Sequence, residues 1–255
     1  MWIVASDLIA DALGLDSPVF NIAKGFFFVA ATTVMLVLAF RRHEDEVATV
    51  ITDLERADRE RIAALEGVAR AVGAMIEARD PYTAGHQQRV GEMSRRIGRR
   101  MGLDAERVEG LRIGGYLHDV GKVAIDEAVL NFPGALSAEQ REHVQQHSAA
   151  GYEILKSVPF AWPVATIALQ HHERLDGSGY PRGLRGDDIL LDARIVAVAD
   201  VFDAMTCERP YREAGSAESA LQLLVAGAGV HFDPGAVNAL ASLVADGVDL
   251  RPGPR

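Results

Sequence analysis

The chain has 255 residues, of which 49% are hydrophobic, and its 26 basic and 36 acidic side chains give a formal net charge of −10. This length suits one large domain with appendages, and the acidic balance argues against broad nucleic-acid binding, which needs a basic surface. The single cysteine, Cys207, excludes an internal disulfide and a cysteine zinc cluster, and it indicates a reducing compartment.

Residues 1–42 differ in composition from the rest of the chain. The segment 19–40 carries one charge, Lys24, and its uncharged part is shorter than the roughly 20 apolar residues that a span needs, unless the Lys24 side chain snorkels. A buried core helix and a secretory signal are the alternatives, although the acidic residues before the segment do not suit a signal. We therefore expect residues 1–42 to be a membrane segment, spanning at about 19–40, with Arg41 and Arg42 on the cytoplasmic side.

Residues 43–79 are predicted to form one long linker helix. Its apolar side chains follow a 4-3 spacing, which Asp58 and Arg61 interrupt; they are Val47, Ile51, Leu54, Leu65, Val68, Val72 and Met75. This spacing is typical of a coiled coil that carries signals from a membrane to a domain. A single amphipathic helix that packs on the domain's own core explains the spacing about equally well.

The remainder of the chain, to about residue 250, has helical patterns throughout and lacks the alternation of strands. Asp104 is a good N-cap, and Ser137 with Gln140 three residues on forms a capping box. The sequence therefore predicts an all-α fold with loops at 119–136 and 173–189.

Five of the eight histidines fall into short clusters beside helical sequence: His86, His118, His147, His171 and His172. Imidazole is the commonest metal ligand in proteins, and helical proteins build multi-metal sites from such scattered side chains. Any one cluster alone is better explained as a polar loop or a surface hydrogen-bonded pair.

Two aspartates strengthen the metal interpretation. Asp119 directly follows His118 where a helix is expected to end, near Gly121, so the two side chains are able to serve one metal cluster there. Asp200 lies in the apolar run IVAVADVFDAM, where an unpaired carboxylate would be costly to bury and a metal is a natural partner.

Five separate segments resemble the HD-GYP branch of the HD superfamily of metal-dependent phosphohydrolases. They are RDPYTAGHQQRV, HDVGK, HSAAGYEIL, QHHERLDGSGYPRGLRG and ADVFDAMTCERPYR, in the family's order over about residues 65–245. The resemblance implies an HD-type helical bundle at 65–250, preceded here by the transmembrane helix and the long signalling helix. It also implies hydrolysis of the bacterial second messenger cyclic di-GMP.

The resemblance also implies roles for individual residues. The ligands of the first metal would be His86, His118, Asp119 and Asp200. Asp119 would bridge to a second metal held by His147, His171 and His172. Lys122 would contact the scissile phosphate, which makes Asp119 and Lys122 the catalytic candidates. The substrate would be bound by Lys122, Arg209, Arg212 and the turn Gly179-Tyr180-Pro181.

One position departs from the family's pattern. Members with three metals carry a glutamate four residues before the first histidine, and this chain has Tyr82 there. A phenol is a poor substitute for a carboxylate, so we expect two divalent ions, with iron or manganese suited to the histidine and carboxylate ligands. A site with fewer metals should cleave cyclic di-GMP mainly to pGpG and only slowly to GMP.

The expected partners follow from the resemblance together with the N-terminal segment and the linker helix. They are cyclic di-GMP, the bacterial inner membrane with the catalytic domain in the cytoplasm, a second copy of the chain through residues 43–79, and a diguanylate cyclase through the GYP loop. Two alternative functions stay open: a non-catalytic cyclic di-GMP sensor or partner-binding module, and an HD phosphohydrolase of another cyclic dinucleotide or nucleotide.

Overall fold

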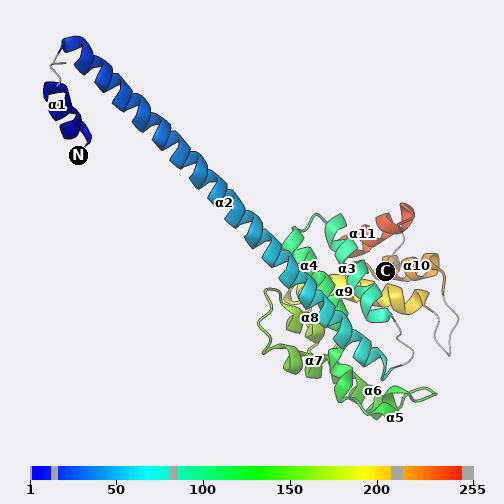
Figure 1. Ribbon diagram of the computed structural model, residues 1–255. Helices are drawn as coiled ribbons and strands as arrows, with labels where there is room; N and C mark the ends of the chain where they lie inside the picture. Colours follow the sequence, from blue (N-terminus) through cyan, green and yellow to red (C-terminus); the bar gives the residue numbers. More distant parts are fainter. Residues whose placement is uncertain (1, 13–16, 81–84, 208–214, 249–255) are drawn as a thin grey trace. The chain divides into compact units, whose positions relative to one another are not determined.

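The computed structural model describes residues 2–12, 17–80, 85–207 and 215–248 (Figure 1). The chain divides into two compact units, Met1–Ala63 and Ala64–Arg255. Helices dominate both units, and the described residues contain no named strand, only two isolated β-bridges. The all-α prediction is confirmed.

The first unit consists of helix α1 (Trp2–Ala12) and most of helix α2 (Pro18–Glu77). By length and composition, α2 contains a stretch that is able to cross a membrane, and none of that stretch is buried within the protein. Large apolar side chains such as Phe26, Leu36 and Phe40 are exposed along it. Length and composition alone do not separate such a stretch from a signal sequence.

The second unit holds the end of α2 and the remaining helices (Figure 1). In chain order these are α3 (His86–Arg100), α4 (Ala105–Leu117), the 3₁₀ helix η2 (Val120–Ala124), α5 (Glu127–Leu130), α6 (Ala138–Gln145), α7 (His147–Leu155), α8 (Val164–Gln170), η3 (Gly186–Asp188), α9 (Leu191–Thr206), α10 (Ala217–Ala226) and α11 (Pro234–Ala245).

Two apolar clusters hold this unit together. The larger one joins α3, α9, α10 and α11 around fully buried side chains such as Ile97, Val196 and Leu240. The smaller one joins the end of α2 to α4 and α8, with Ile76 and Ile113 at its centre. Helices α3 and α9, which take part in the larger cluster, also carry metal-ligand candidates, so the core fixes their positions.

The predicted helix starts are confirmed. Asp104 accepts a hydrogen bond from the backbone N–H of Arg107 at the start of α4. Ser137 and Gln140 form a reciprocal capping box at the start of α6. The predicted loops are less open than expected, because η2 and α5 lie within 119–136 and η3 lies within 173–189. Helices this short leave no periodic pattern in a sequence.

Helix α2 packs on the core of its unit through a face that the 4-3 spacing indicated only in part: of the stripe, Val72 packs against this core. The buried residues of its last turns are Ala69, Gly73 and Ile76. Val68 and Met75, which belong to the predicted stripe, are 62% and 71% exposed. The apolar stripe is therefore not explained by packing on the domain's own core at these two positions.

Candidate metal centre

Helix ends supply most of the candidate ligands. His86 is the first residue of α3 and His147 the first of α7, while His118 and His171 are the C-caps of α4 and α8. Neighbours inside a regular helix point about 100° apart, but a helix end releases that restriction. Asp119 thus reaches the same space as His118, as the sequence predicted.

Three of the imidazoles are held from behind by backbone carbonyls three residues earlier. The Nδ1–H groups of His118, His147 and His171 donate to the carbonyl oxygens of residues 115, 144 and 168 at 2.7, 2.7 and 2.9 Å. This fixes the tautomer and leaves each Nε2 as a lone pair facing inward, which is how metal-ligating histidines are oriented.

The inward Nε2 lone pairs are suited to bind a metal ion and cannot form hydrogen bonds with one another. Nε2 of His147 lies 3.4 Å from Nε2 of His171, but neither can donate while both Nδ1 atoms carry the hydrogens. Nε2 of His118 is buried and makes no hydrogen bond. Buried polar atoms are normally paired, and a cation is the partner that suits these Nε2 atoms.

Asp119 stands between two groups of histidines. Its Oδ1 lies 3.3 Å from Nε2 of His147 and 3.8 Å from Nε2 of His171. Its Oδ2 lies 3.4 Å from Nε2 of His118 and 3.9 Å from Nε2 of His86. The two oxygens of one carboxylate therefore face two different ligand groups.

The candidate ligands converge as two sets that share Asp119. One set is His86, His118 and Asp119, the other is Asp119, His147, His171 and His172, and within each set the potential ligand atoms lie within 4.8 Å of one another. Asp200 joins the first set, since its Oδ1 lies 3.3 Å from Nε2 of His86. All seven residues predicted as ligands are thus brought together.

Burial and charge give the ligands protonation states that suit metal binding. Burial lowers the pKa of His147 and His171, and it lowers the pKa of His172 to about 3, so these imidazoles are neutral at pH 7. Burial alone would raise the pKa of Asp119, but the charge of Lys122 and the neighbouring His118 hold it well below its usual range. Asp119 is therefore an anion beside the neutral imidazoles of the second set.

In the first set, neighbouring carboxylates raise the pKa of a histidine. Burial alone would lower the pKa of His86, but hydrogen bonds and charges from Asp200 and Asp203 raise it to about 9. Asp203 is buried, lies 2.7 Å from Nδ1 of His86, and binds Arg89 through both of its oxygens. Sequence reasoning missed Asp203, although it lies three residues after Asp200 on the same apolar helix.

Lys122 lies beside the ligand candidate that the two sets share. Its Nζ is 2.7 Å from Oδ2 of Asp119 and 3.5 Å from Oδ2 of the buried Asp80. Burial alone would lower the pKa of Lys122, but the charges of these two aspartates raise it. The ammonium is therefore charged and held beside the bridging carboxylate.

The GYP turn packs directly against the second ligand set. The ring of Tyr180 lies 4.6 Å from the ring of His172, and the Tyr180-Pro181 peptide bond is cis. A Cβ added to Gly179 would lie 2.4 Å from the carbonyl oxygen of His172, so only glycine fits there. The buried Glu173, which sequence reasoning missed, accepts hydrogen bonds from two backbone N–H groups of the following loop.

Three residues singled out from the sequence lie outside the described residues: Tyr82, Arg209 and Arg212. Their predicted roles in metal count and phosphate binding therefore stay predictions.

This chain is a helical bundle that holds two adjoining sets of histidine and aspartate side chains, an arrangement that suits metal-binding hydrolase folds. The profile of the HD domain family matches residues 70–236, and the chain belongs to this family. The fold also resembles that of a cyclic GMP-AMP specific phosphodiesterase of Vibrio cholerae, with a TM-score of 0.57 and 24% identity over 71% of this chain and 49% of that one.

Two curated relatives are similar in sequence. The cyclic di-GMP phosphodiesterase response regulator RpfG of Xanthomonas campestris is 42% identical over 77% of this chain and 51% of its own length. The 3'3'-cGAMP-specific phosphodiesterase 3 of Vibrio cholerae is 42% identical over 68% of this chain and 37% of its own length. The chain thus spans about half or less of these relatives.

Proposed function

We propose that this chain is a metal-dependent phosphodiesterase that hydrolyses cyclic di-GMP to pGpG and only slowly to GMP. The observation that carries the proposal is Asp119, whose two oxygens face separate histidine groups. Such a carboxylate is suited to bridge two ions. The complete set of converging ligands argues against a non-catalytic sensor, which would not need them.

Two divalent ions, iron or manganese, suit this set of nitrogen and oxygen ligands. When bound, they would activate water and neutralise charge on the phosphoryl oxygens. The chain's own residues prepare the site for them: backbone carbonyls fix the imidazole tautomers, and Lys122 adds a held ammonium that is able to donate to a phosphoryl oxygen. Arg209 and Arg212 are proposed to hold the substrate's phosphates.

A cavity of about 590 Å³ beside the second ligand set supports a nucleotide substrate. It is lined by residues that include His172, Arg174, Tyr180, Leu223, His231 and Phe232. The mixture of flat rings, an aliphatic side chain and a guanidinium suits a purine base, which stacks on π-faces and accepts hydrogen bonds. We place one base of the substrate here, with the GYP turn as one wall.

A second candidate substrate is 3'3'-cGAMP. The specific observation in its favour is the 42% identity to a relative that is named for this substrate. The two compounds differ in one purine, so the same metal chemistry serves both. The base contacts decide between them.

The proposal extends to location and partners. The exposed apolar stretch of α2 supports a span in the bacterial inner membrane, with the catalytic domain in the cytoplasm. The exposed stripe of α2 supports a homodimer through residues 43–79. The exposed Pro181 and Arg182 in the GYP loop are available to a diguanylate cyclase partner.

A substrate panel tests the proposed activity. The full chain in detergent, reconstituted with Mn²⁺ or with Fe²⁺ under anaerobic conditions, is given cyclic di-GMP, 3'3'-cGAMP and cyclic di-AMP separately, and products are separated by chromatography. We expect the highest kcat/KM for cyclic di-GMP. A higher value for 3'3'-cGAMP would transfer the proposal to that substrate, and binding without turnover of any of them would favour a sensor.

A further inference from the structure

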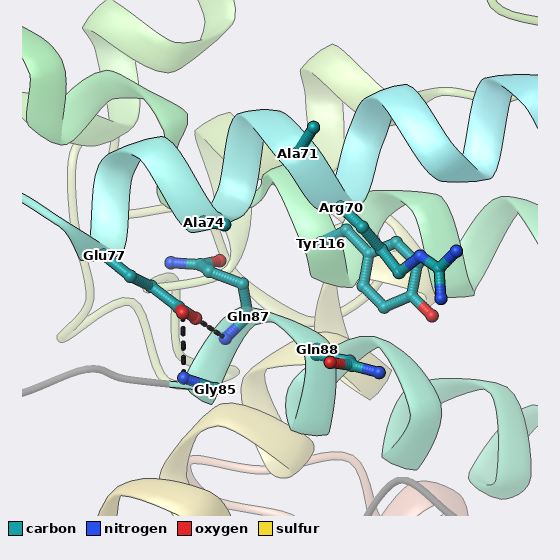
Figure 2. Close-up of a pocket in the computed structure, with 8 residues that line it drawn as sticks. All are labelled: Arg70, Ala71, Ala74, Glu77, Gly85, Gln87, Gln88 and Tyr116. Carbon is teal, nitrogen blue, oxygen red and sulfur yellow. Dashed lines mark hydrogen bonds between the residues drawn. The ribbon is translucent and has the colours of Figure 1, made fainter. Parts of the chain in front are cut away.

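The last turn of α2 caps the helix that begins with a metal-ligand candidate. Helix α3 starts after Gly85, which has a left-handed conformation and no side chain to cap the free N–H groups. Glu77 supplies the cap from α2. Its Oε2 accepts a hydrogen bond from the N–H of Gly85 and its Oε1 accepts one from the N–H of Gln87, both at 2.8 Å (Figure 2).

These two N–H groups lie on either side of His86. Glu77 therefore fixes the backbone both before and after the imidazole that faces Asp200 and Asp119. A carboxylate at a helix N-terminus is also favoured by the helix dipole, so the contact is strong as well as bidentate.

Gln87 links the end of α2 to Asp119, the carboxylate that the two ligand sets share. Its side chain is buried, and its Nε2 donates to Oδ2 of Asp119 at 3.4 Å. On its other side it packs against α2 at Gly73, where an added Cβ would lie 3.2 Å from Cβ of Gln87. The position of Gln87 is thus set by α2 through both backbone and side chain.

The residues that follow Glu77 hold the second stretch of the site. Asp80 is buried and pairs with Lys122, which pairs in turn with Asp119. Arg79 donates to the carbonyl oxygens of residue 123, within η2, and of residue 125, directly after it. The end of α2 therefore contacts two of the three chain segments that carry the first ligand set, the one at His86 and the one that follows His118 and Asp119.

We propose that Glu77 is a positioning residue for this set, through which the end of α2 controls how tightly the first metal is held. The inference rests on the proposed metal-dependent function, because it concerns the same site. Displacing the end of α2 would break two hydrogen bonds that flank His86 while leaving His147, His171 and His172 in place. The first metal should then be held more weakly, while the second, which shares only Asp119 with the first set, should change much less.

Glu77→Gln tests this inference, because an amide has one acceptor oxygen and would place an NH₂ group against a backbone N–H. The matched control is Glu66→Gln on the same helix. Glu66 pairs with Arg112 on α4 at 2.8 Å, so its loss also removes an ion pair between helices, but the pair lies away from the end of α4 that carries His118. Melting temperature is measured for both variants, and the metal-free full chain in detergent is titrated with Mn²⁺ by calorimetry.

We expect Glu77→Gln to weaken one of two Mn²⁺ binding steps about tenfold to a hundredfold, as for other residues that orient ligands, and to change the other step much less. Saturating Mn²⁺ should restore most of its hydrolysis of bis(p-nitrophenyl) phosphate. Glu66→Gln should lower the melting temperature without changing either step. Unchanged binding in Glu77→Gln, or equal weakening in both variants, would overturn the inference alone. Wild-type chain that binds no Mn²⁺ would overturn the proposed function as well.

Discussion

Single side chains behind the candidate ligands orient them for metal binding. Asp203 lies 2.7 Å from Nδ1 of His86 and also binds Arg89, so it orients the imidazole and balances its charge. The three carbonyl-bound histidines need no such carboxylate, because the backbone orients them. His86 is therefore the ligand most sensitive to a change in its neighbour.

Asp203→Asn should lower metal affinity and turnover by about tenfold to a hundredfold, because the amide weakens the anionic partner of His86. Asp192→Asn is the matched control. Asp192 is another buried aspartate of α9 that binds an arginine, Arg107, at 2.8 Å, but it lies apart from the ligand sets. The control should lose thermal stability and keep its metal. Metal content after gel filtration and kcat/KM separate the two, and equal losses in both variants would show that Asp203 acts only through stability.

Among single residues, the sequence predicts the candidate ligands better than the residues that hold those ligands in place. His147 and Asp119 were recognisable because their residue types and spacing themselves suggest metal chemistry. Asp203, Gln87 and Glu173 were not, since their roles depend on partners that are far away in the sequence and meet only in the folded chain. An apolar helix with two aspartates was the only signal available for Asp203.

Among the elements, η2 and α7 approach one another too closely for any side chain at Gly121. A Cβ there would lie 1.9 Å from the carbonyl oxygen of His147, the first residue of α7. The glycine that the sequence suggested as a helix end is thus needed for this close approach. It sets the distance between the segment of Asp119 and the helix of His147.

Gly121→Ala should therefore push α7 away, with a loss of about 1–3 kcal/mol in the free energy of unfolding and weaker binding of the second metal. Gly67→Ala is the control, because a Cβ added at Gly67 in α2 meets nothing within 4 Å and should be neutral or slightly stabilising. Chemical denaturation and Mn²⁺ titration measure both effects. A Gly121→Ala protein as stable as wild type would contradict the close packing.

Most of the 4-3 stripe of α2 is exposed, and we expect a second copy of the chain to cover it. Leu54 is 65% exposed on this stripe, and Arg56 two residues on lies on the opposite side of the helix. In a Cys207→Ala background, Leu54→Cys should form an intermolecular disulfide in membranes and Arg56→Cys should not. Equal crosslinking of both, or of neither, would argue against a coiled coil through this stripe.

Helix starts were predictable at this scale because caps are local: Asp104 and Ser137 act on residues three positions away. The packing face of α2 was predictable only in part, because the small residues Ala69 and Gly73 lie on it beside Ile76, while the larger Val68 and Met75 stay exposed. A hydrophobicity pattern weights large side chains, so it indicated the exposed stripe. The short helices η2 and η3 were missed for lack of a period.

For the molecule as a whole, the number of bound metals is the property that the sequence predicts most sharply. Tyr82 replaces the expected third-site carboxylate, and the described ligands form two sets around Asp119. Metal analysis of the full chain should therefore give about two ions per chain. Tyr82→Glu should raise the number toward three, with Tyr82→Gln, which lacks the charge, as the control. Three tightly bound ions in the wild type would show that another residue replaces the missing ligand.

A chromatographic time course of cyclic di-GMP hydrolysis by the metal-loaded full chain tests the central claim most directly. The control is the variant Asp119→Ala, whose helical content should equal that of the wild type. Asp119 is the shared ligand of both sets, so its loss should abolish turnover and lower bound metal. The wild type should convert cyclic di-GMP to pGpG, which accumulates before GMP appears, because a two-metal site has less charge to hold the more anionic linear product. Hydrolysis that persists in Asp119→Ala, or a metal-loaded wild type that leaves cyclic di-GMP intact, would contradict the account.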